Sequence, residues 1–272
     1  MKERTLLYKL YQNHTGKVSD KWSLYLEEWD RTLSPFRNQH INLLEIGVQN
    51  GGSLEIWAKY FPKAEKIIGC DIDEACNYLQ YEDPRITVLV GDANSDQCET
   101  NILNIAKSYD VIIDDGSHQS GDVIQSFVRY FPLLNTDGIY LVEDLHCSYW
   151  QDYSGGLYNP LSSMAFFKRL ADIINFEHWR SNRTRTDYLV QFANFFGIQI
   201  NEFDLARMHS IEFINSCCII RKSSPDRNLI GKRIIAGLDE QITNTAKNLN
   251  GTSIHDVSTA IKDDSELDVF EL

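Results

Sequence analysis

The feature that most constrains the fold is a series of five short apolar runs, each ending at or beside an acidic residue. Stretches long enough for helices separate the runs, which are Asn42–Gly47, Ile67–Ile72, Ile86–Val90, Asp110–Asp114 and Gly138–Glu143. Near-continuous apolar strands that alternate with helices are typical of a parallel sheet covered on both faces. Ligands bind outside the carboxyl ends of such strands, so the acidic residues there predict a binding site along one edge.

The sequence as a whole predicts an α/β fold: a Rossmann-like, doubly wound sheet that is mostly parallel. Ser210–Lys222 reads as an antiparallel hairpin with a tight turn at Asn215-Ser216, which would close the sheet. Residues 1–40 carry apolar side chains at helical spacing and predict a helical cap, followed by a ligand-binding domain over residues 41–222. Residues 223–272 are interpreted as a peripheral helical tail. Both extensions are natural places for subunit contacts, so a homo-oligomer is a further expectation.

Composition restricts the partners of the chain. Its 272 residues carry a formal net charge of -13, which argues against a general affinity for nucleic acid. No apolar run approaches the length of a membrane span, so no membrane partner is expected. The six cysteines form no C-x-x-C pair and read as core residues in a reducing compartment, which predicts a cytoplasmic location.

A glycine-rich turn follows the first apolar run, in the sequence EIGVQNGGS from Glu45 to Ser53. Glycines at such a turn let the backbone approach a ligand closely before a helix begins. A dinucleotide fingerprint would have glycine at position 45, where the glutamate would repel a pyrophosphate. The pattern E-x-G-x-x-x-G instead resembles the first motif of class I methyltransferases, whose cofactor is S-adenosylmethionine.

That resemblance implies a cofactor site along the first four strand ends. Asp71 ends the second run and is placed to bind ribose hydroxyls. Asp92 resembles the family residue that meets the adenine amino group. The full set of expected cofactor residues is Glu45, Gly47, Asn50, Gly51, Ser53, Asp71, Asp92 and Asp114.

Further acidic residues follow the fourth and fifth runs, in DDGSH (Asp114 to His118) and EDLHCSYW (Glu143 to Trp150). The two strands are neighbours in the methyltransferase sheet, so Asp115, Glu143 and Asp144 are expected to converge. Three crowded carboxylates repel one another unless a cation lies between them. Oxygen ligands favour a hard ion, which is magnesium first, with calcium or manganese as alternatives. His118 could then act as the general base toward a metal-bound hydroxyl.

These two motifs resemble those of the metal-dependent sugar O-methyltransferases of the macrocin and mycinamicin group. The likeness covers roughly residues 15–222, including SDKW before the first strand and the closing hairpin. It implies that Asp115, Glu143 and Asp144 bind the metal and that His118 is the base. The expected partner is a small-molecule sugar or glycosylated acceptor. His146, Tyr149 and Trp150 are candidate substrate contacts.

Several alternatives remain open at this point. A catechol or other phenol could replace the sugar, since the same oxygen ligands would serve it. The sugar itself could be free, nucleotide-linked or part of a glycosylated natural product or surface glycan. An oxidoreductase that uses a nicotinamide dinucleotide is disfavoured by Glu45. A scaffold without chemistry is disfavoured because it would have no need to hold this many carboxylates together.

Overall fold

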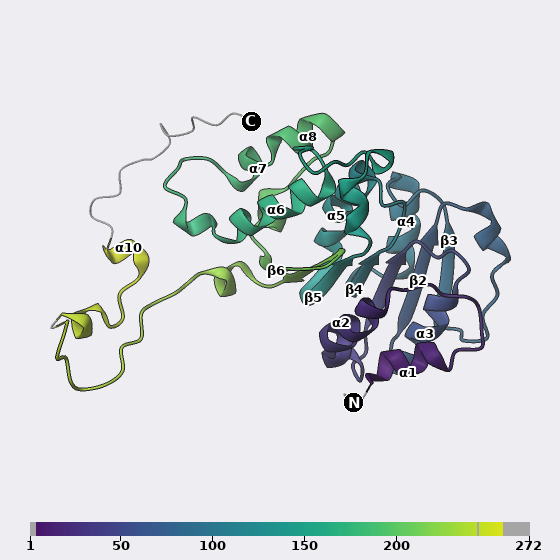
Figure 1. The fold of residues 1–272 in the computed structure, drawn as a ribbon, viewed down its shortest axis with the longest axis horizontal. Helices are drawn as coiled ribbons and strands as arrows, with labels where there is room; N and C mark the ends of the chain where they lie inside the picture. Colours follow the sequence, from purple (N-terminus) through teal and green to yellow (C-terminus); the bar gives the residue numbers. More distant parts are fainter. Residues whose placement is uncertain (1–3, 244, 258–272) are drawn as a thin grey trace.

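The computed structural model describes residues 4–243 and 245–257, and its centre is a seven-stranded sheet (Figure 1). The strand order is β3-β2-β1-β4-β5-β7-β6. The strands are β1 (Asn42–Ile46), β2 (Lys66–Asp71), β3 (Ile86–Val90), β4 (Tyr109–Asp114), β5 (Leu134–Val142), β6 (Met208–Ile214) and β7 (Cys217–Lys222). Each of the five predicted apolar runs is therefore a strand, displaced by a few residues at most.

Strands β1 to β5 are all parallel, whereas β7 pairs antiparallel with both β5 and β6. The predicted doubly wound sheet with a closing hairpin is confirmed. The hairpin turns at Asn215 and Ser216, and Ser216 has the positive φ of 70° that a two-residue turn of this kind requires. Because β1 to β5 run in the same direction, their acidic carboxyl ends lie along one edge.

Helices cover both faces of the sheet and make a three-layer structure. They are α1 (Leu6–Gln12), α2 (Ser23–Leu33), α3 (Gly52–Tyr60), α4 (Asp96–Ile105), α5 (Ser120–Tyr130), α6 (Ser163–Ile174), α7 (Arg185–Tyr188), α8 (Val190–Phe196), α9 (Glu202–Leu205) and α10 (Ile254–Val257). Helices α1, α2 and α3 share one apolar core with the sheet, whereas α4, α5, α6 and α8 share the other. Short 3-10 turns include Leu145–Tyr149 and Gln151–Tyr153, which follow β5.

The N-terminal helices form a cap that packs against the first of these cores. Tyr25 and Trp29 of α2 are fully buried and their rings stack, with centroids 5.3 Å apart. The carboxylate of Asp30 accepts a hydrogen bond from the backbone of Leu7 and so joins α2 to α1. The segment between these helices runs along the carboxyl edge of the sheet, since the carbonyl of Val18 accepts a hydrogen bond from Gly52 in the glycine turn.

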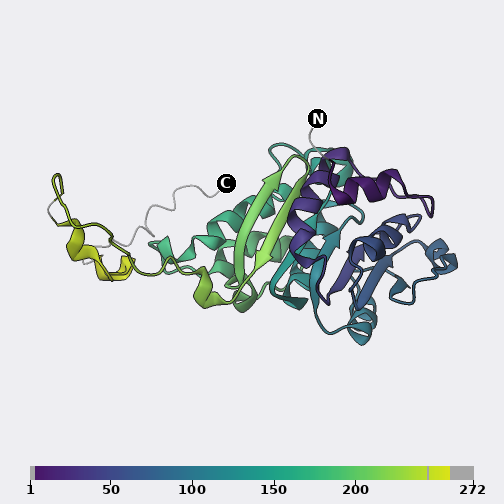
Figure 2. The ribbon, with the colours of Figure 1, turned by 90° about the horizontal axis from the view of Figure 1, so that it is seen from below.

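The chain beyond β7 differs from the predicted helical tail. Its described part, residues 224–243 and 245–257, forms an arm that extends away from the sheet (Figure 2). The arm is irregular apart from 3-10 turns at Pro225–Asn228 and Ala246–Leu249, an isolated antiparallel bridge between Lys232 and Ser253, and the four residues of α10. Few apolar residues of the arm meet the body, so nothing favours a long helix with a buried face. Residue 244 and residues 258–272 of the predicted extension lie outside the described residues.

Two remaining expectations concern cysteines and membranes. All six cysteines are buried and free, as predicted for core residues. In the part of the chain that the structure describes, none of the helices combines the length and apolar character needed to span a bilayer.

Candidate cofactor pocket and metal centre

The glycine turn after β1 brings the backbone close to the β4 loop. Gly47 has a φ of 92°, and a side chain there would place its Cβ 1.9 Å from the carbonyl oxygen of Asp115. Gly51 also has a positive φ, 81°, and immediately precedes α3. Position 47 therefore requires glycine, both because of its positive φ and because the loops after β1 and β4 approach each other closely there.

Asp71, at the end of β2, fixes the conformation of this turn. One of its carboxylate oxygens accepts hydrogen bonds from the backbone N–H groups of Val48 at 2.7 Å and Gln49 at 2.8 Å. The other accepts from the backbone of Asp73 at 2.9 Å. The carboxylate also lines the cavity beside the turn, so it can both hold the backbone and face a ligand.

A cavity of about 440 Å³ lies outside the carboxyl ends of β1, β2, β3 and β4. This volume is within the range usual for small-molecule sites. The predicted cofactor residues that line it are Gly47, Ser53, Asp71, Asp92 and Asp114. Lining residues that the sequence argument missed include Gln49, Ala93, Ser126 and the cap segment Val18–Lys21. Asn50 and Gly51 belong to the turn but are not among the lining residues.

Glu45 lies beneath the cavity rather than in its wall. It is fully buried, and one carboxylate oxygen accepts a hydrogen bond from the Ser53 hydroxyl at 2.7 Å. Burial raises the pKa of Glu45 to about 7, and burial raises the pKa of Asp114 to about 7 as well. Charge is therefore costly at both positions, which is common at ligand sites.

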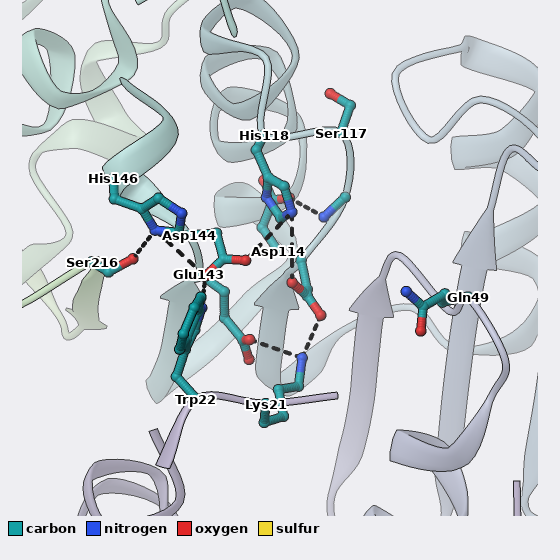
Figure 3. Close-up of polar contacts among 12 residues, drawn as sticks. Lys21, Trp22, Gln49, Asp114, Ser117, His118, Glu143, Asp144, His146 and Ser216 are labelled. Carbon is teal, nitrogen blue, oxygen red and sulfur yellow. Dashed lines mark hydrogen bonds and ion pairs between the residues drawn. The ribbon is translucent and has the colours of Figure 1, made fainter. Parts of the chain in front are cut away.

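At one end of the cavity, three side chains bring candidate metal-ligand atoms close together, and Figure 3 shows two of them, His118 and Asp144, facing each other. The three residues are Asp115, His118 and Asp144, whose candidate ligand atoms all lie within 4.8 Å of one another. His118 Nε2 is 4.0 Å from Asp115 Oδ1 and 3.7 Å from Asp144 Oδ2. His118 and Asp144 have positive φ values of 58° and 51°, a conformation that costs energy in residues other than glycine and clusters at functional sites.

The other oxygen of Asp144, Oδ1, is held by the cap and the hairpin. It accepts hydrogen bonds from the Trp22 indole at 3.0 Å and from the Tyr25 hydroxyl at 2.8 Å. Ser216, in the turn between β6 and β7, also contacts the Tyr25 hydroxyl and lies 2.5 Å from His146 Nδ1. Asp144 is therefore fixed through one oxygen, which leaves Oδ2 facing His118.

Glu143, the third predicted metal ligand, lies apart from this group of three. It is buried, with one oxygen bonded to the Trp29 indole at 2.9 Å and the other to Lys21 Nζ at 2.8 Å. Lys21 Nζ also pairs with Asp115 and lies 3.8 Å from Glu45. A lysine of the cap thus occupies the position between carboxylates where the sequence argument expects a metal ion (Figure 3).

Lys21 and Trp22 are the main site residues that the sequence argument missed. Both lie in the SDKW motif, which carried part of the family resemblance, but nothing in their spacing shows that they reach β4 and β5. A buried lysine is disfavoured by desolvation, yet the attraction of Glu143, Asp115 and Glu45 outweighs it and raises the pKa of Lys21 well above its ordinary value. Lys21 therefore keeps its positive charge within the site.

Aromatic rings surround the open side of this cluster. The ring of His146 lies 6.1 Å from that of Trp22 and 4.8 Å from that of Trp150, and Tyr153 lies 6.5 Å from His118. Trp22 is 60% exposed and Trp150 is 50% exposed, so their faces are available to a ligand. Of the three predicted substrate contacts, His146 and Trp150 thus lie beside the cluster, and Tyr149 is partly exposed on the same turn.

Comparison with known proteins shows which proteins the chain is similar to. Residues 44–145 match a family described as a methyltransferase domain. The chain resembles 8-demethyl-8-alpha-L-rhamnosyl tetracenomycin-C 2'-O-methyltransferase of Streptomyces olivaceus, at 33% identity over an alignment covering 61% of this chain and 46% of that protein. Demethylmacrocin O-methyltransferase of Streptomyces fradiae is 34% identical, with 57% of this chain and 42% of that protein covered.

A third relative and a solved structure extend the comparison. Mycinamicin VI 2''-O-methyltransferase of Micromonospora griseorubida is 30% identical, and the alignment covers 70% of this chain and 47% of that protein. The chain spans about half the length of these relatives. The structure of MycE methyltransferase from the mycinamycin biosynthetic pathway, in complex with Mg and SAH, shares the fold with a TM-score of 0.68 at 24% identity over 91% of this chain and 60% of that one.

Residues 44–145 match the methyltransferase domain family, and this match and the O-methyltransferase relatives support the predicted class. All three relatives are O-methyltransferases by name, and one of them is named for a rhamnosyl tetracenomycin.

Proposed function

We propose that the protein is an S-adenosylmethionine-dependent, magnesium-dependent O-methyltransferase that acts on a hydroxyl of a sugar in a glycosylated small molecule. The observation that carries the proposal is the convergence of Asp115, His118 and Asp144 at the end of the cavity beside the glycine turn. A methyl donor in the cavity would then lie next to a centre that can bind and deprotonate a hydroxyl. The names of the relatives support the same reaction class.

The wall of the cavity supports S-adenosylmethionine as the cofactor. Gly47 lets the backbone approach the ligand without a side chain in the way. Asp71 and Asp92 line the cavity at successive strand ends, where they can accept hydrogen bonds from ribose hydroxyls and an adenine amino group. Glu45 supports the turn from below through Ser53 and would not touch the cofactor directly.

The residues at the other end fit a hard divalent cation. Asp115 Oδ1 and Asp144 Oδ2 are the carboxylate oxygens of the cluster that face His118. Glu143 lies outside the cluster but shares Lys21 Nζ with Asp115, so it could supply a third oxygen ligand once Lys21 is displaced. We propose Asp115, Glu143 and Asp144 as the protein ligands of magnesium. When bound, the ion would act as a Lewis acid and lower the pKa of a coordinated hydroxyl.

His118 is the proposed general base. Its Nε2 atom faces the two inward carboxylate oxygens, so an acceptor hydroxyl held there would lie within reach of the imidazole. Bound S-adenosylmethionine would supply the methyl group and would leave as the neutral thioether once the acceptor oxygen had taken its methyl carbon. The hydroxyl proton moves to His118, which later releases it to water.

Charge and aromatic surface favour a neutral sugar over a nucleotide-linked one. Among the described residues that line the cavity, Lys21 is the only lysine or arginine, and carboxylates already hold it. Eight aspartates line the same cavity and would repel a diphosphate. The exposed rings of Trp22 and Trp150 could instead stack on the apolar face of a sugar.

The test is calorimetric titration of S-adenosylmethionine, with and without magnesium, followed by methyl transfer to three acceptor panels. The panels are neutral glycosides, nucleotide sugars and catechols. We expect cofactor binding, and magnesium-dependent transfer to glycosides alone. Transfer to catechols alone would move the acceptor to the phenol class. Failure to bind S-adenosylmethionine would contradict the proposal as a whole.

We further propose that the protein self-associates through its C-terminal arm. Ile234, Leu238 and Ile242 on the arm are 89%, 92% and 97% exposed, which is unusual for three large aliphatic residues in one segment. The segment 229–242 carries no net charge, because Lys232 and Arg233 are balanced by Asp239 and Glu240, whereas the whole chain carries -13. A second copy of the arm can therefore pack against this segment without charge repulsion. The buried free thiols support a reducing, cytoplasmic location for such an oligomer.

A further inference from the structure

Lys21 has a contact set that neither the cofactor nor the acceptor requires. Its side chain is only 2% exposed, although it lies on the loop before α2 rather than inside an element. Its ammonium lies between Asp115 and Glu143, and Glu45 is 3.8 Å away. Each of these three carboxylates comes from a different strand end, β1, β4 or β5, so Lys21 joins the ends of three strands.

The same contacts use oxygens that a divalent ion would need. Both oxygens of Glu143 are engaged, one by Trp29 and one by Lys21. Asp115 gives one oxygen to Lys21, and its other oxygen faces His118. An ion that bound both carboxylates would therefore meet the ammonium at close range, where two positive charges in a poorly hydrated site repel strongly.

We propose that Lys21 is an internal cation that competes with the divalent metal for Asp115 and Glu143, and that metal binding displaces its ammonium from between them. This inference rests on the proposed magnesium site. In the absence of metal, the ammonium offsets the repulsion among the clustered carboxylates. Lys21 thereby keeps the ligands in place, while it lowers the affinity of the site for metal. It is a positioning residue, since its role is exerted through the carboxylates.

The contacts of the neighbouring segment explain how the lysine can move. Lys17 anchors the start of the segment through Glu55 at 2.8 Å, and the Trp22 indole anchors its end on Asp144 at 3.0 Å. The residues between these anchors, Val18 to Asp20, line the cavity instead of packing in the core. Displacement of the Lys21 ammonium therefore requires a change in a short loop and no disruption of α2 or the sheet.

The first experiment measures magnesium affinity by calorimetry for the wild-type protein and the Lys21→Met variant. We expect the variant to bind magnesium at least about tenfold more tightly, because the competing charge is gone. Lys21→Arg keeps the charge and should not gain affinity. Lys17→Met is the matched control, since Lys17 lies on the same segment but pairs with Glu55 outside the cluster. Equal or weaker magnesium binding by Lys21→Met would overturn the competition.

The second experiment uses the wild-type protein and does not depend on the folding of a variant. Lysine acetylation by acetic anhydride is followed by mass spectrometry, first with chelator and then with magnesium at a concentration that calorimetry shows to be saturating. We expect magnesium to increase the labelling rate of Lys21 severalfold and to leave that of Lys17 unchanged. An unchanged rate for Lys21 would overturn the displacement.

The outcomes also separate this inference from the proposed function. Magnesium that binds the wild type without affecting Lys21 would leave the metal centre intact and overturn only the role of Lys21. Absence of magnesium binding in both the wild type and Lys21→Met would overturn the metal centre and this role together. Binding of S-adenosylmethionine, measured separately, would then still decide whether the methyltransferase proposal stands.

Discussion

Opposite ends of the sheet each bury a lysine, and the surroundings of the two lysines differ in kind. Lys21, at the carboxyl end, faces three carboxylates. Lys222 lies at the amino end of β5 and donates hydrogen bonds to the carbonyls of Phe131 at 3.0 Å and Pro132 at 2.8 Å. Burial lowers the pKa of Lys222 to about 8, whereas the pKa of Lys21 is raised.

The difference shows which end of the sheet is built for chemistry. At the amino end, neutral carbonyls are sufficient to hold a buried lysine. At the carboxyl end, the chain gathers Glu45 and Glu143, whose pKa is raised first by burial and then by nearby carboxylates, and a cation between these acids offsets the repulsion. Such an arrangement is costly for stability, so its presence indicates a function.

The largest expected effect on methyl transfer comes from Asp115, which pairs with Lys21 and lies 4.0 Å from His118 Nε2. We expect Asp115→Asn to lower methyl transfer by about a thousandfold or more, because a metal ligand and its charge are lost. The affinity for S-adenosylmethionine should change little. Steady-state kinetics and calorimetry on the same preparation measure the two effects.

Asp20→Asn is the matched control for Asp115→Asn. Asp20 is exposed and lines the same cavity, and the substitution removes the same formal charge. We expect nearly unchanged methyl transfer in this control. A comparable loss in both variants would show that the total charge of the cavity matters, and not a specific ligand at Asp115.

The next largest effect on methyl transfer is expected at His118. Its substitution tests whether the carboxyl end of the sheet holds a general base. We expect His118→Ala to slow turnover by about a hundredfold or more, the usual scale for loss of a general base. The rate of the variant should also rise with pH over a range where that of the wild type has levelled off. A change in acceptor KM alone would assign to His118 only a role in placing the substrate.

A smaller effect is expected at Asp71, which belongs to the cofactor part of the same edge. Its carboxylate accepts hydrogen bonds from Val48 and Gln49, so Asp71→Ala removes both a ribose contact and the support of the glycine turn. We expect S-adenosylmethionine affinity to fall by about tenfold or more, since each lost hydrogen bond to a charged group contributes about 1.5–3 kcal/mol. Magnesium affinity should stay the same. Joint loss of both affinities would mean that the two parts of the site are not separable.

Most of the fold could be predicted from the sequence because its signals are local. Apolar runs of strand length, a glycine pattern after the first run and an Asn-Ser turn each specify their own structure with little help from distant residues. The parallel direction of β1 to β5 then places Asp71, Asp92, Asp114 and Asp115 along one edge. The cofactor cavity follows from that geometry.

The part of the site that could not be predicted depends on contacts across the chain. Lys21 pairs with Glu143 over 122 residues and with Asp115 over 94 residues, and no spacing in the sequence reveals such contacts. The sequence predicts that the carboxylates lie together and that a cation lies between them. It does not predict that the ammonium of Lys21 is a cation at this position. The prediction of a helical tail was wrong for the described part of the arm. The large aliphatic residues of the arm are exposed, so no helical face packs against the body.

The smallest effect is expected at Lys222, and it completes the comparison with Lys21. In the unfolded chain this lysine keeps its proton until about pH 10.5, whereas in the folded protein it releases the proton near pH 8. Between these pH values the unfolded state binds more protons, so the free energy of unfolding should increase as pH rises through this window. The difference in pKa corresponds to at most about 3.5 kcal/mol. Chemical denaturation of the wild type and Lys222→Met from pH 7 to 10.5 measures the effect as the difference between the two proteins, because the variant lacks this titration. A difference independent of pH would mean that the ammonium of Lys222 is stabilised as well as that of Lys21, and that the contrast between the two ends of the sheet does not lie in charge.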